Sequence, residues 1–578
     1  HEGQHAALAS SSRPKTIPKE EFFDNLFQKL KNRFVSEDNE RFLPWNDLRL
    51  VLDNNTVREC ILQLDVEEEQ YIQIYGDRCS SSRLRILATL ILTDCIDYYH
   101  LNSFLEEGIF DNSLPLKEEN APVFTRWTDR EKNAFCKEQY IVLAPCFNFS
   151  RDKLRHYIFD PSIPMPFFNL RSVGRGGDGM VSSVTIQSGH HWVSEQGLGT
   201  EGKIFALKEF TKYTTFAKER EALDHFSGAN PGHDHLSRLL LSFDRASKWY
   251  MIFDWANEDL ENFWKTFSSH PKSHIHLSWL IAQCHGMAEG LSKVHGDGEK
   301  QQISTTTPPI PDRGRHGDIK PSNILCFNQN RHGEMKPSNI PQDDSRLIDY
   351  QLVVADFTLM HFHSPYSLGG TSPRNLACSR SYRPPEKDIE SAIKIDQSYD
   401  VWTLGCVYLE FISWYLLGYE AVREDYFCYL GKYVKSFPKM RMDEKSDLPQ
   451  DDFFIMTKNR FLSFPAVVKP GVVKWFQFLR QNKDCSQAIH DILDLIEKHM
   501  LVPNPKGRWK MFEISERLET IHKKCERDEA YCSKGVPRRV NFISRFGKDF
   551  PPQGRVAVVP ETFIHRSIGH KRDRKDIF

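Results

Sequence analysis

Long apolar segments are missing from this chain of 578 residues. Its two longest apolar runs, Leu84–Ile96 and Val407–Leu417, are too short or too interrupted to cross a bilayer. We therefore expect buried helices at both places and no insertion into a membrane. The first residues are polar and offer no secretory signal.

An excess of either charge is also missing. The sequence has 76 basic and 78 acidic residues, a formal net charge of −2, and 40% hydrophobic residues. This balance is typical of a globular protein and argues against nucleic acid as a partner. The 13 cysteines are scattered singly, without a C-x-x-C pair or a paired metal spacing. We expect thiols in a reducing, intracellular compartment, either cytoplasmic or nuclear.

Local patterns divide the chain into five parts. Apolar residues recur at helical spacing after residue 20, as in Phe22, Leu26 and Leu30, and predict a small helical domain that docks partners or braces the rest. The expected parts are a disordered leader (1–20), the helical N-terminal domain (21–110), a connector (111–164), a large domain (165–522) and a basic C-terminal tail (523–578).

The large domain changes character along its length. Short β-branched and aromatic runs between residues 172 and 253 predict an antiparallel sheet, with one helix near Thr215–Phe226. From Leu277 through Ile521 the pattern is mainly helical. The sequence therefore predicts an α+β domain in which a small sheet precedes a larger helical part.

A ten-residue phrase occurs twice in the helical part. Residues 315–324 read RHGDIKPSNI, and residues 331–340 read RHGEMKPSNI. The first copy places Asp318, Lys320 and Asn323 at the spacing D-x-K-x-x-N. This spacing suits phosphoryl transfer, because it supplies a carboxylate that accepts the proton of an incoming hydroxyl, a cation near the transferred phosphate and an amide oxygen for a metal ion. The second copy has Glu334 in place of the aspartate.

A glycine-rich turn lies between two of the predicted strands. Gly174, Gly176, Gly179 and Val181 fit the pattern G-x-G-x-x-G-x-V. Glycines let backbone N–H groups approach phosphate oxygens, because no Cβ is in the way. A strand on either side, and not a strand followed by a helix, distinguishes this turn from a dinucleotide-binding turn.

Two further charged residues follow apolar strands. A lysine inside a strand, such as Lys208, needs an anionic partner, since an unpaired buried ammonium is costly. Nucleotide phosphates and Glu219 are candidate partners, and the alternative is an ordinary surface lysine. Asp356 follows the apolar run Leu352–Ala355, and together with Asn323 and phosphate it offers the oxygen ligands that Mg²⁺ prefers.

In this order, the motifs resemble those of the eukaryotic protein kinases over roughly residues 165–522. Ser381–Glu386 is similar to the family's A-P-E segment, and Asp400–Gly405 is similar to its D-x-W-x-x-G helix start. Arg508 stands where kinases keep the arginine that pairs with the glutamate of A-P-E. The chain looks most like fungal serine/threonine kinase-like proteins that have HGD in place of HRD and a helical N-terminal domain.

The resemblance implies a bilobal α+β fold with ATP and Mg²⁺ between the lobes. The small antiparallel lobe would cover residues 165–256 and the larger helical lobe residues 257–522, with an insertion near 327–346. Asp254 and Trp255 would form the hinge that faces adenine. The family assigns catalysis or nucleotide binding to the residues that occupy its motif positions here, namely Asp318, Lys320, Lys208, Glu219, Gly174, Gly176, Gly179, Val181, Ala206 and Leu325, with Asn323 and Asp356 as metal ligands.

The resemblance also implies a substrate class. Lys320 lies two residues after Asp318, as in kinases that phosphorylate serine or threonine. Ser379 occupies the position of the hydroxyl that steadies this aspartate and lysine in those enzymes. We therefore expect a protein substrate with a serine or threonine hydroxyl as the acceptor.

The residues after each asparagine distinguish the two copies. Asn323 is followed by ILCF, which can form a strand, whereas Asn339 is followed by Pro341, which lacks a backbone donor, and by a polar run. The spacing to the metal-binding aspartate favours the second copy, but doubling a flexible loop costs only about 0.6 kcal/mol. Because glutamate is longer than aspartate, Glu334 would place its carboxylate oxygens about one methylene away from the position that an aspartate would give them. We assign catalysis to the first copy and regard residues 331–340 as part of the insertion.

Three departures from the family pattern bear on activity. Gly317 replaces the arginine that receives an activation-loop phosphate in many kinases, so we expect activity that does not depend on such phosphorylation. Thr358 replaces a glycine and restricts the backbone, so Mg²⁺ binding should survive while switching of the loop could be lost. The insertion could crowd the mouth of the cleft.

Every catalytic group is nevertheless present, and the favoured function is an active serine/threonine protein kinase. One alternative is a pseudokinase that binds nucleotide or partners without turnover. The other is a scaffold that acts through partner contacts of its N-terminal domain.

Overall fold

A computed structural model describes most of the chain. The described residues are 18–37, 40–76, 81–117, 121–149, 154–176, 179–194, 197–198, 203–227, 232–268, 273–296, 313–330, 344–363, 379–389, 395–442, 450–457 and 464–538. The chain divides into two compact units. Unit 1 contains residues 1–211 and 240–252, and unit 2 contains residues 212–239 and 253–578. The second copy of the repeated phrase, residues 331–340, lies outside the described residues.

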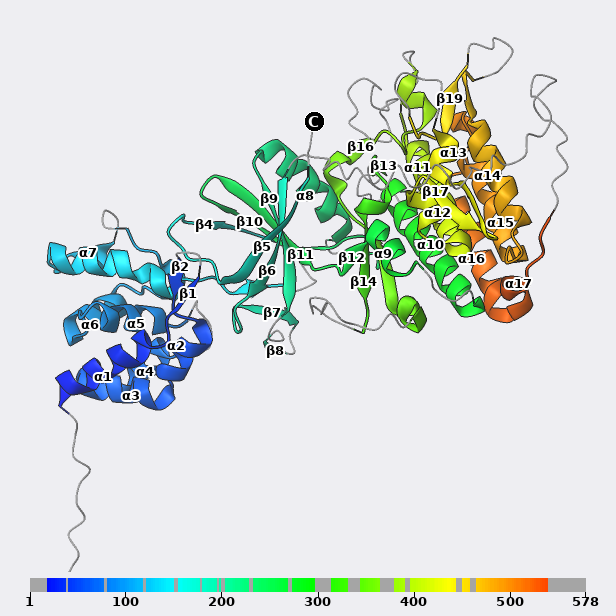
Figure 1. The fold of residues 1–578 in the computed structure, drawn as a ribbon. Coiled ribbons are helices and arrows are strands. Elements are labelled where there is room, and N and C mark those ends of the chain that lie inside the picture. Colours follow the sequence, from blue (N-terminus) through cyan, green and yellow to red (C-terminus); the bar gives the residue numbers. More distant parts are fainter. Residues whose placement is uncertain are drawn as a thin grey trace, which may run out of the picture. The chain divides into compact units, whose positions relative to one another are not determined.

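The first part of unit 1 is helical, with a short hairpin (Figure 1). Its elements are α1 (Lys19–Lys31), β1 (Val35–Glu37), β2 (Glu40–Phe42), α2 (Trp45–Val51), α3 (Asn54–Gln63), η1 (Glu68–Gln70), α4 (Tyr71–Ile74), α5 (Leu84–Leu92), α6 (Tyr98–Glu106), η2 (Asp111–Ser113), η3 (Pro122–Phe124), α7 (Asp129–Glu138) and η4 (Gln139–Val142).

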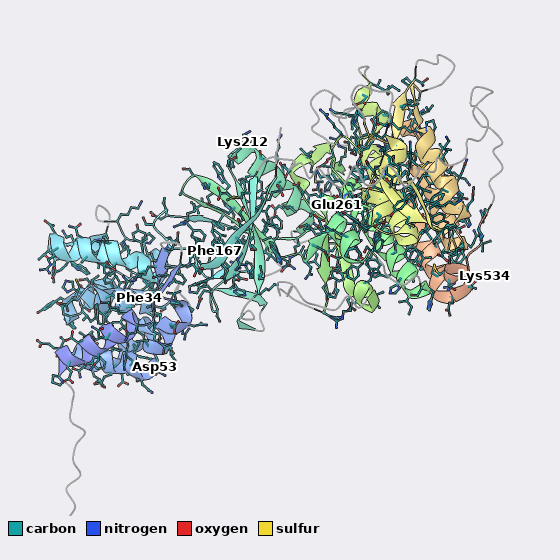
Figure 2. The ribbon with its side chains drawn as sticks, in the orientation of Figure 1. Phe34, Asp53, Phe167, Lys212, Glu261 and Lys534 are labelled. Carbon is teal, nitrogen blue, oxygen red and sulfur yellow. A yellow bond between two sulfur atoms is a disulfide. The ribbon has the colours of Figure 1, made fainter. Side chains whose placement is uncertain are left out.

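Capping side chains determine where several of these helices begin. Asp53, which is labelled in Figure 2, lies at the start of α3. Its side chain accepts a hydrogen bond from the Thr56 amide at 2.7 Å. Asp97 caps α6 in the same way. Thr128 and Glu131 form a reciprocal capping box at the start of α7. Because α7 packs its Phe135 into the same core as the earlier helices, the helical part continues well beyond residue 110.

A six-stranded sheet forms the second part of unit 1, in the order β4-β10-β11-β9-β6-β5 (Figure 1). The pairs β5–β6 and β6–β9 are antiparallel, as expected, but β4 pairs with β10 in the parallel sense. The strands are β4 (Arg155–Phe159), β5 (Phe167–Gly176), β6 (Gly179–Ile186), β9 (Ile204–Phe210), β10 (Leu239–Arg245) and β11 (Lys248–Asp254), and a smaller sheet contains β3 (Phe147–Asn148), β7 (His191–Ser194) and β8 (Gly197–Leu198).

The helical part and the sheet of unit 1 share one apolar core, which includes Leu87 of α5 and Phe243 of β10. Polar contacts join the same two parts. The Trp45 amide at the start of α2 donates to Nε2 of His190 at 2.9 Å, and Arg245 of β10 forms a 2.7 Å ion pair with Glu40 of β2. The first part of the chain is therefore built into the sheet unit.

Unit 2 is mainly helical. Its elements are α8 (Tyr213–Ser227), β12 (Glu258–Asp259), α9 (Leu260–Thr266), α10 (His274–His295), β13 (Arg313–Arg315), η5 (Pro321–Asn323), β14 (Ile324–Asn328), η6 (Asp344–Asp349), β15 (Tyr350–Val354), η7 (Phe357–Leu359), β16 (His361–His363), η9 (Pro385–Asp388), α11 (Ser398–Leu417), α12 (Glu420–Arg423), β17 (Tyr426–Tyr429), β18 (Lys432–Lys435), α13 (Phe437–Arg441), β19 (Phe454–Met456), β20 (Ala466–Val468), α14 (Pro470–Gln481), α15 (Gln487–Leu495), η10 (Ile496–Met500), η11 (Pro505–Gly507), α16 (Met511–Arg527) and α17 (Glu529–Ser533).

Helix α11 is the centre of unit 2. It is apolar on all sides, and nearly every one of its side chains is buried. Two of the large aromatic side chains packed here satisfy their ring N–H groups inside the unit: Trp414 donates to the Trp264 carbonyl at 2.8 Å, and Trp475 donates to the Ser413 hydroxyl at 2.8 Å. The expectation that Leu84–Ile96 and Val407–Leu417 contribute buried helices is confirmed.

Among the helices that the structure describes, none has both the length and the apolar character needed to cross a membrane. One expectation about the cysteines is wrong. Cys525 of α16 and Cys532 of α17 form a disulfide, because the turn between these two helices brings their Cα atoms to 5.5 Å. The other cysteines of the described residues are thiols.

Candidate active site

The loop that contains Asp318 is held between two short strands of unit 2. It begins after β13, which pairs with β16, and leads through η5 into β14, which pairs with both β12 and β15. The apolar residues after Asn323 therefore form the strand expected of them. The Asn323 carbonyl accepts from the Ala355 amide at 2.9 Å, which fixes the end of the loop beside the residue that precedes Asp356.

A buried carboxylate fixes the backbone of this loop. Asp400, at the start of α11, accepts hydrogen bonds from the amides of His316 at 2.8 Å and Gly317 at 2.9 Å. His295, at the end of α10, lies 2.9 Å from the same carboxylate through Nε2. Burial acts to raise the pKa of Asp400, but the hydrogen bonds from His295 and Gly317 hold it below its usual value. Asp400 is therefore a charged acceptor that orients the loop from within the core.

Gly317 adopts a conformation that glycine favours. Its φ is +84°, and a Cβ built on it would lie 3.2 Å from the Leu359 carbonyl oxygen and 3.6 Å from Nε of Arg315. Arg315 is fully buried and donates from Nη1 to the Ile395 carbonyl at 2.9 Å. Burial lowers the pKa of Arg315, although the nearby Asp400 acts in the opposite direction. An arginine at position 317 would therefore meet both backbone strain and close neighbours.

The side chains of the loop converge on one carboxylate. Lys320 donates through Nζ to Oδ2 of Asp318 at 2.7 Å and to the hydroxyl of Ser379 at 3.0 Å. Ser379 in turn donates to Oδ1 of Asp318 at 2.7 Å. Asn323 donates through Nδ2 to the Asp318 carbonyl oxygen at 2.8 Å and to Oδ2 at 3.0 Å. The structure thus brings together Asp318, Lys320, Asn323 and Ser379, as the sequence indicates.

Asp356 lies at the end of β15 in a left-handed conformation, with φ of +67°. The next residue, Phe357, is buried and packs its ring 5.0 Å from that of His316. The hydroxyl of Thr358 lies 2.5 Å from Oδ1 of Asp356 and 2.7 Å from Oε2 of Glu219 on α8. The segment 356–358 therefore contacts the catalytic loop on one side and α8 on the other.

The donor atoms in unit 2 fit a magnesium ion. Asn323 uses its amide nitrogen as a hydrogen-bond donor, so its amide oxygen is the atom left for a cation. Asp356 supplies carboxylate oxygens, and oxygen ligands are those that Mg²⁺ prefers. Within the described part of the chain, no group of three or more His, Cys, Asp or Glu side chains is arranged to hold a metal on its own. A cation held by Asn323 and Asp356 would therefore complete its coordination with phosphate oxygens and water.

The predicted phosphate-binding residues lie on the sheet of unit 1. Gly174 and Gly176 end β5, and Gly179 and Val181 begin β6, so the glycine-rich turn joins two antiparallel strands. A Cβ built on Gly179 would lie 2.3 Å from the Glu209 carbonyl oxygen of β9, so only glycine allows this strand approach.

Val181, Ala206 and Lys208 share one face of that sheet. Val181 is opposite Lys208 in the pairing of β6 with β9, and Ala206 lies two residues before Lys208 on the same strand. Ala206 and Lys208 are partly exposed, with fully buried Phe205 next to Ala206 on the opposite face. This face can therefore present an apolar contact and a cation together.

The predicted hinge residues, Asp254 and Trp255, and the predicted nucleotide contact Leu325 lie in unit 2. Asp254 ends β11, Trp255 follows it, and both are partly buried. The next segment is fixed by a bond from the Asn257 amide to the Cys326 carbonyl at 3.0 Å. Leu325 of β14 is opposite Asp259 on one side and Val353 on the other. The structure thus joins the hinge segment to the strand after the catalytic loop.

Glu386 and Arg508 form the pair that the sequence suggests. The guanidinium donates through Nη1 to Oε1 at 2.6 Å and through Nη2 to Oε2 at 2.7 Å, and both side chains are buried. This bidentate ion pair fixes η9, which contains Glu386, against the segment that follows η11.

Two groups in this site could not be assigned from the sequence. Asp400 was visible only as part of a helix-start motif, and its bonds to the loop amides required the fold. For His295 no signal exists, since a single histidine at a helix end has no distinctive pattern. The contact of the Thr358 hydroxyl with Glu219 has no signal in the sequence either, because the two residues are 139 positions apart.

Comparison with known proteins agrees with this geometry. The family model described as protein kinase domain matches residues 169–518, which is more than half of the chain. The chain belongs to the protein kinase family. The α+β kinase fold expected from the motifs is thereby confirmed, with the sheet in unit 1 and the catalytic loop in unit 2.

Curated kinases show weaker similarity. Homeodomain-interacting protein kinase 4 from Homo sapiens is 26% identical over 218 residues, which cover 36% of this chain and 28% of the relative. Mitogen-activated protein kinase hog1 from Blastobotrys adeninivorans is 25% identical over 264 residues, which cover 45% of this chain and 52% of the relative. The kinase therefore spans at most about half the length of these relatives.

Proposed function

We propose that this kinase is catalytically active and transfers the γ-phosphate of ATP to a serine or threonine hydroxyl of a protein substrate. One observation carries the proposal: Lys320 and Asn323 both donate to Oδ2 of the Asp318 carboxylate, and Ser379 donates to Oδ1. Such an arrangement holds a base, a cation and a metal ligand on one rigid loop, and phosphoryl transfer depends chiefly on positioning and charge.

In the proposed reaction, the carboxylate of Asp318 accepts the proton of the acceptor hydroxyl. The hydroxyl oxygen forms a bond to the γ-phosphorus while the bond from that phosphorus to the β–γ bridging oxygen breaks, and ADP leaves. Lys320 lies beside Asp318 at 2.7 Å, where its charge can stabilise the transferred group. Asn323 and Asp356 would hold Mg²⁺, which supplies charge neutralisation and orientation of the phosphates.

On unit 1, backbone amides of the glycine-rich turn would bind phosphate oxygens, with Gly179 required for the close approach of β6 to β9. Lys208 would add a cation on the sheet face that it shares with Ala206. Ala206 and Leu325 would contact adenine, and the backbone of Asp254 and Trp255 would bind its edge. The apolar and charged groups on the described strands support this assignment.

The preference for serine or threonine is the finer part of the proposal. It rests on Lys320 two residues after Asp318 and on the bond from Lys320 to Ser379. A peptide library with serine, threonine or tyrosine as the only acceptor tests it. We expect phosphate on the first two, and incorporation on tyrosine alone would contradict the assignment.

The test of activity compares wild type with Asp318→Asn and Glu334→Gln in phosphate transfer from Mg²⁺-ATP. Removing the base should lower the rate by about 100-fold or more. Glu334 lies in the second copy of the phrase, so its replacement should leave the rate nearly unchanged. If wild type binds ATP but transfers nothing, the alternative of a nucleotide-binding pseudokinase replaces this proposal.

Three wider assignments are also proposals. We infer that the helical part of unit 1 contacts partner proteins, because Leu62, Ile72 and Tyr99 expose 70%, 76% and 73% of their surface there. We place the kinase inside the cell because the cysteines of the described residues other than Cys525 and Cys532 are thiols. The HGD sequence and the helical N-terminal part support its assignment to the fungal kinase-like group.

A further inference from the structure

The hydroxyl of Thr358 lies between two carboxylates that the kinase reaction uses. Oγ1 is 2.7 Å from Oε2 of Glu219 and 2.5 Å from Oδ1 of Asp356. Glu219 is on α8 and exposes only 2% of its surface, whereas Asp356 is exposed at the end of β15. A glycine at position 358 could make neither contact.

A hydroxyl carries one proton, so Thr358 can donate to only one of these carboxylates at a time. Before Mg²⁺ binds, both carboxylates compete for that proton. A cation on Asp356 would compensate its charge, and the proton would then serve Glu219. The hydrogen bond between the loop and α8 would therefore be strongest when the metal site is filled.

Phe357, next to Thr358, connects the same segment to the loop that contains Asp318. Phe357 is buried and contacts His316, whose amide is bound to Asp400. The loop 356–358 is thus fixed to the catalytic loop through Phe357, while Thr358 reaches α8. The Thr358 hydroxyl therefore adds a directed hydrogen bond to the packing of η7 against α8, and it is the part of this contact that also reaches Asp356.

We propose that Thr358 is a positioning residue that couples the metal site at Asp356 to the placement of Glu219 on α8. This inference rests on the proposed nucleotide-binding function and deepens it. In a simpler, local role the hydroxyl would only donate a hydrogen bond to Asp356, two residues earlier. The 2.7 Å contact with a buried glutamate on another element goes beyond that local role.

The variants Thr358→Val and Thr358→Ser separate the hydroxyl from the rest of the side chain. Valine keeps the shape and the β-branch but has no hydroxyl, and serine keeps the hydroxyl without the methyl group. The first measurement is the Mg²⁺ concentration that half-saturates binding of the fluorescent nucleotide mant-ADP to the full chain. We expect about a tenfold increase for valine, as for the loss of one hydrogen bond to a charged group, and less than a twofold change for serine.

The second measurement is hydrogen exchange of peptides from residues 213–227, with peptides from residues 398–417 as the internal reference. Valine should raise exchange in α8 but not in α11, and Mg²⁺ with nucleotide should slow exchange in α8 of wild type and of the serine variant only. Exchange in α8 can be measured whether or not the protein turns over ATP, so a catalytically silent chain tests this inference separately from the proposed function.

Two results would overturn the coupling. One is a valine variant with the exchange of α8 and the Mg²⁺ dependence of wild type. The other is a serine variant that loses as much as valine, which would assign the effect to the methyl group. If no nucleotide binds at all, hydrogen exchange of α8 in the valine and serine variants, compared with wild type, is the measurement that decides whether Thr358 positions α8.

Discussion

Arg508 and Glu386 are 122 residues apart in the chain, yet they form a buried ion pair with two parallel hydrogen bonds of 2.6 and 2.7 Å. Removing one member of such a pair leaves the other charge buried without compensation. We expect Arg508→Leu to lower the free energy of unfolding of unit 2 by about 3–5 kcal/mol, measured by urea denaturation.

The exposed pair formed by Lys523 and Glu519 on α16 is the matched control. Lys523→Leu should cause no measurable loss, because exposed pairs contribute little. Restoration of stability by Arg508→Leu combined with Glu386→Leu would further identify the uncompensated charge as the cause. A single Arg508→Leu variant as stable as wild type would contradict the prediction.

Ser379 should matter for rate more than for binding. Its hydroxyl contacts both Asp318 and Lys320, so Ser379→Ala would leave the base and the cation without their common partner. We expect kcat to fall by roughly 10- to 100-fold, in the range that ångström-scale misplacement produces, with KM for ATP nearly unchanged. Ser379→Thr keeps the hydroxyl and should retain most of the rate. A rise in KM alone would point instead to a role in nucleotide binding.

Gly317 should be intolerant of a side chain. At φ of +84°, Gly317→Ala should lower the stability of unit 2 by about 1–2 kcal/mol, the cost of a left-handed alanine. Gly174→Ala is the control for stability, because a Cβ there would meet no atom within 4 Å. Thermal unfolding checks both variants. Equal melting temperatures for Gly317→Ala and wild type would show that the loop accommodates the strain.

Because position 317 cannot supply an arginine, activity should not depend on phosphorylation of the activation segment. The serines and threonines between residues 364 and 378 are Ser364, Ser367, Thr371 and Ser372, which lie outside the described residues. We expect the variant with all four changed to alanine to retain phosphotransfer within a factor of a few. Loss of all activity would show that another cation of this kinase binds a phosphate there.

The buried His190 should make unit 1 sensitive to acid. Burial, reinforced by Arg85 and His191, lowers the pKa of His190 to about 4 from its usual value of 6.5, while its bond to the Pro145 carbonyl acts in the opposite direction. Between these values the unfolded chain binds a proton that the folded chain does not, so stability falls as pH falls from 6.5 toward 4. The slope from this group is about 1.4 kcal/mol per pH unit.

His190→Gln removes this titration and should reduce the slope, while His191, whose pKa burial also lowers to about 4, keeps its own contribution. Hydrogen exchange of peptides from residues 40–52 and 184–194, measured from pH 7 to pH 4.5, reports directly on the contact between His190 and the start of α2. His235 in unit 2 also has its pKa lowered to about 4 by burial, so His235→Gln is a control that leaves unit 1 unchanged. An unaltered slope in His190→Gln would assign the acid sensitivity to other groups.

The catalytic loop could be predicted from sequence because its chemistry is local. Asp318, Lys320 and Asn323 lie within six residues, and the β-strand after Asn323 follows from its apolar run. The glycine-rich turn was equally readable, since Gly179 allows a strand approach that no other residue permits. In these cases residue type and spacing together determine the structure.

Long-range contacts were less accessible. The parallel pairing of β4 with β10 joins residues 86 positions apart, and residues 155–159 of β4 show no alternation of buried and exposed side chains. The hydrogen bond from the Thr358 hydroxyl to Glu219 spans 139 positions, and the one from the Gly317 amide to Asp400 spans 83. Propensity and periodicity describe neighbours along the chain, so contacts of this kind come only from the packed fold.

The contact of His190 with the Trp45 amide, between the sheet and the helical part of unit 1, limits how short a folded fragment of this chain can be. The matched family region begins at residue 169, but the sheet in that region shares its apolar core with α5 and is bonded to β2 and α2. A fragment cut at residue 169 would expose that core face and the buried imidazole to water. Expression of the region that matches the family therefore requires about 150 preceding residues, because they cover the apolar face of the sheet.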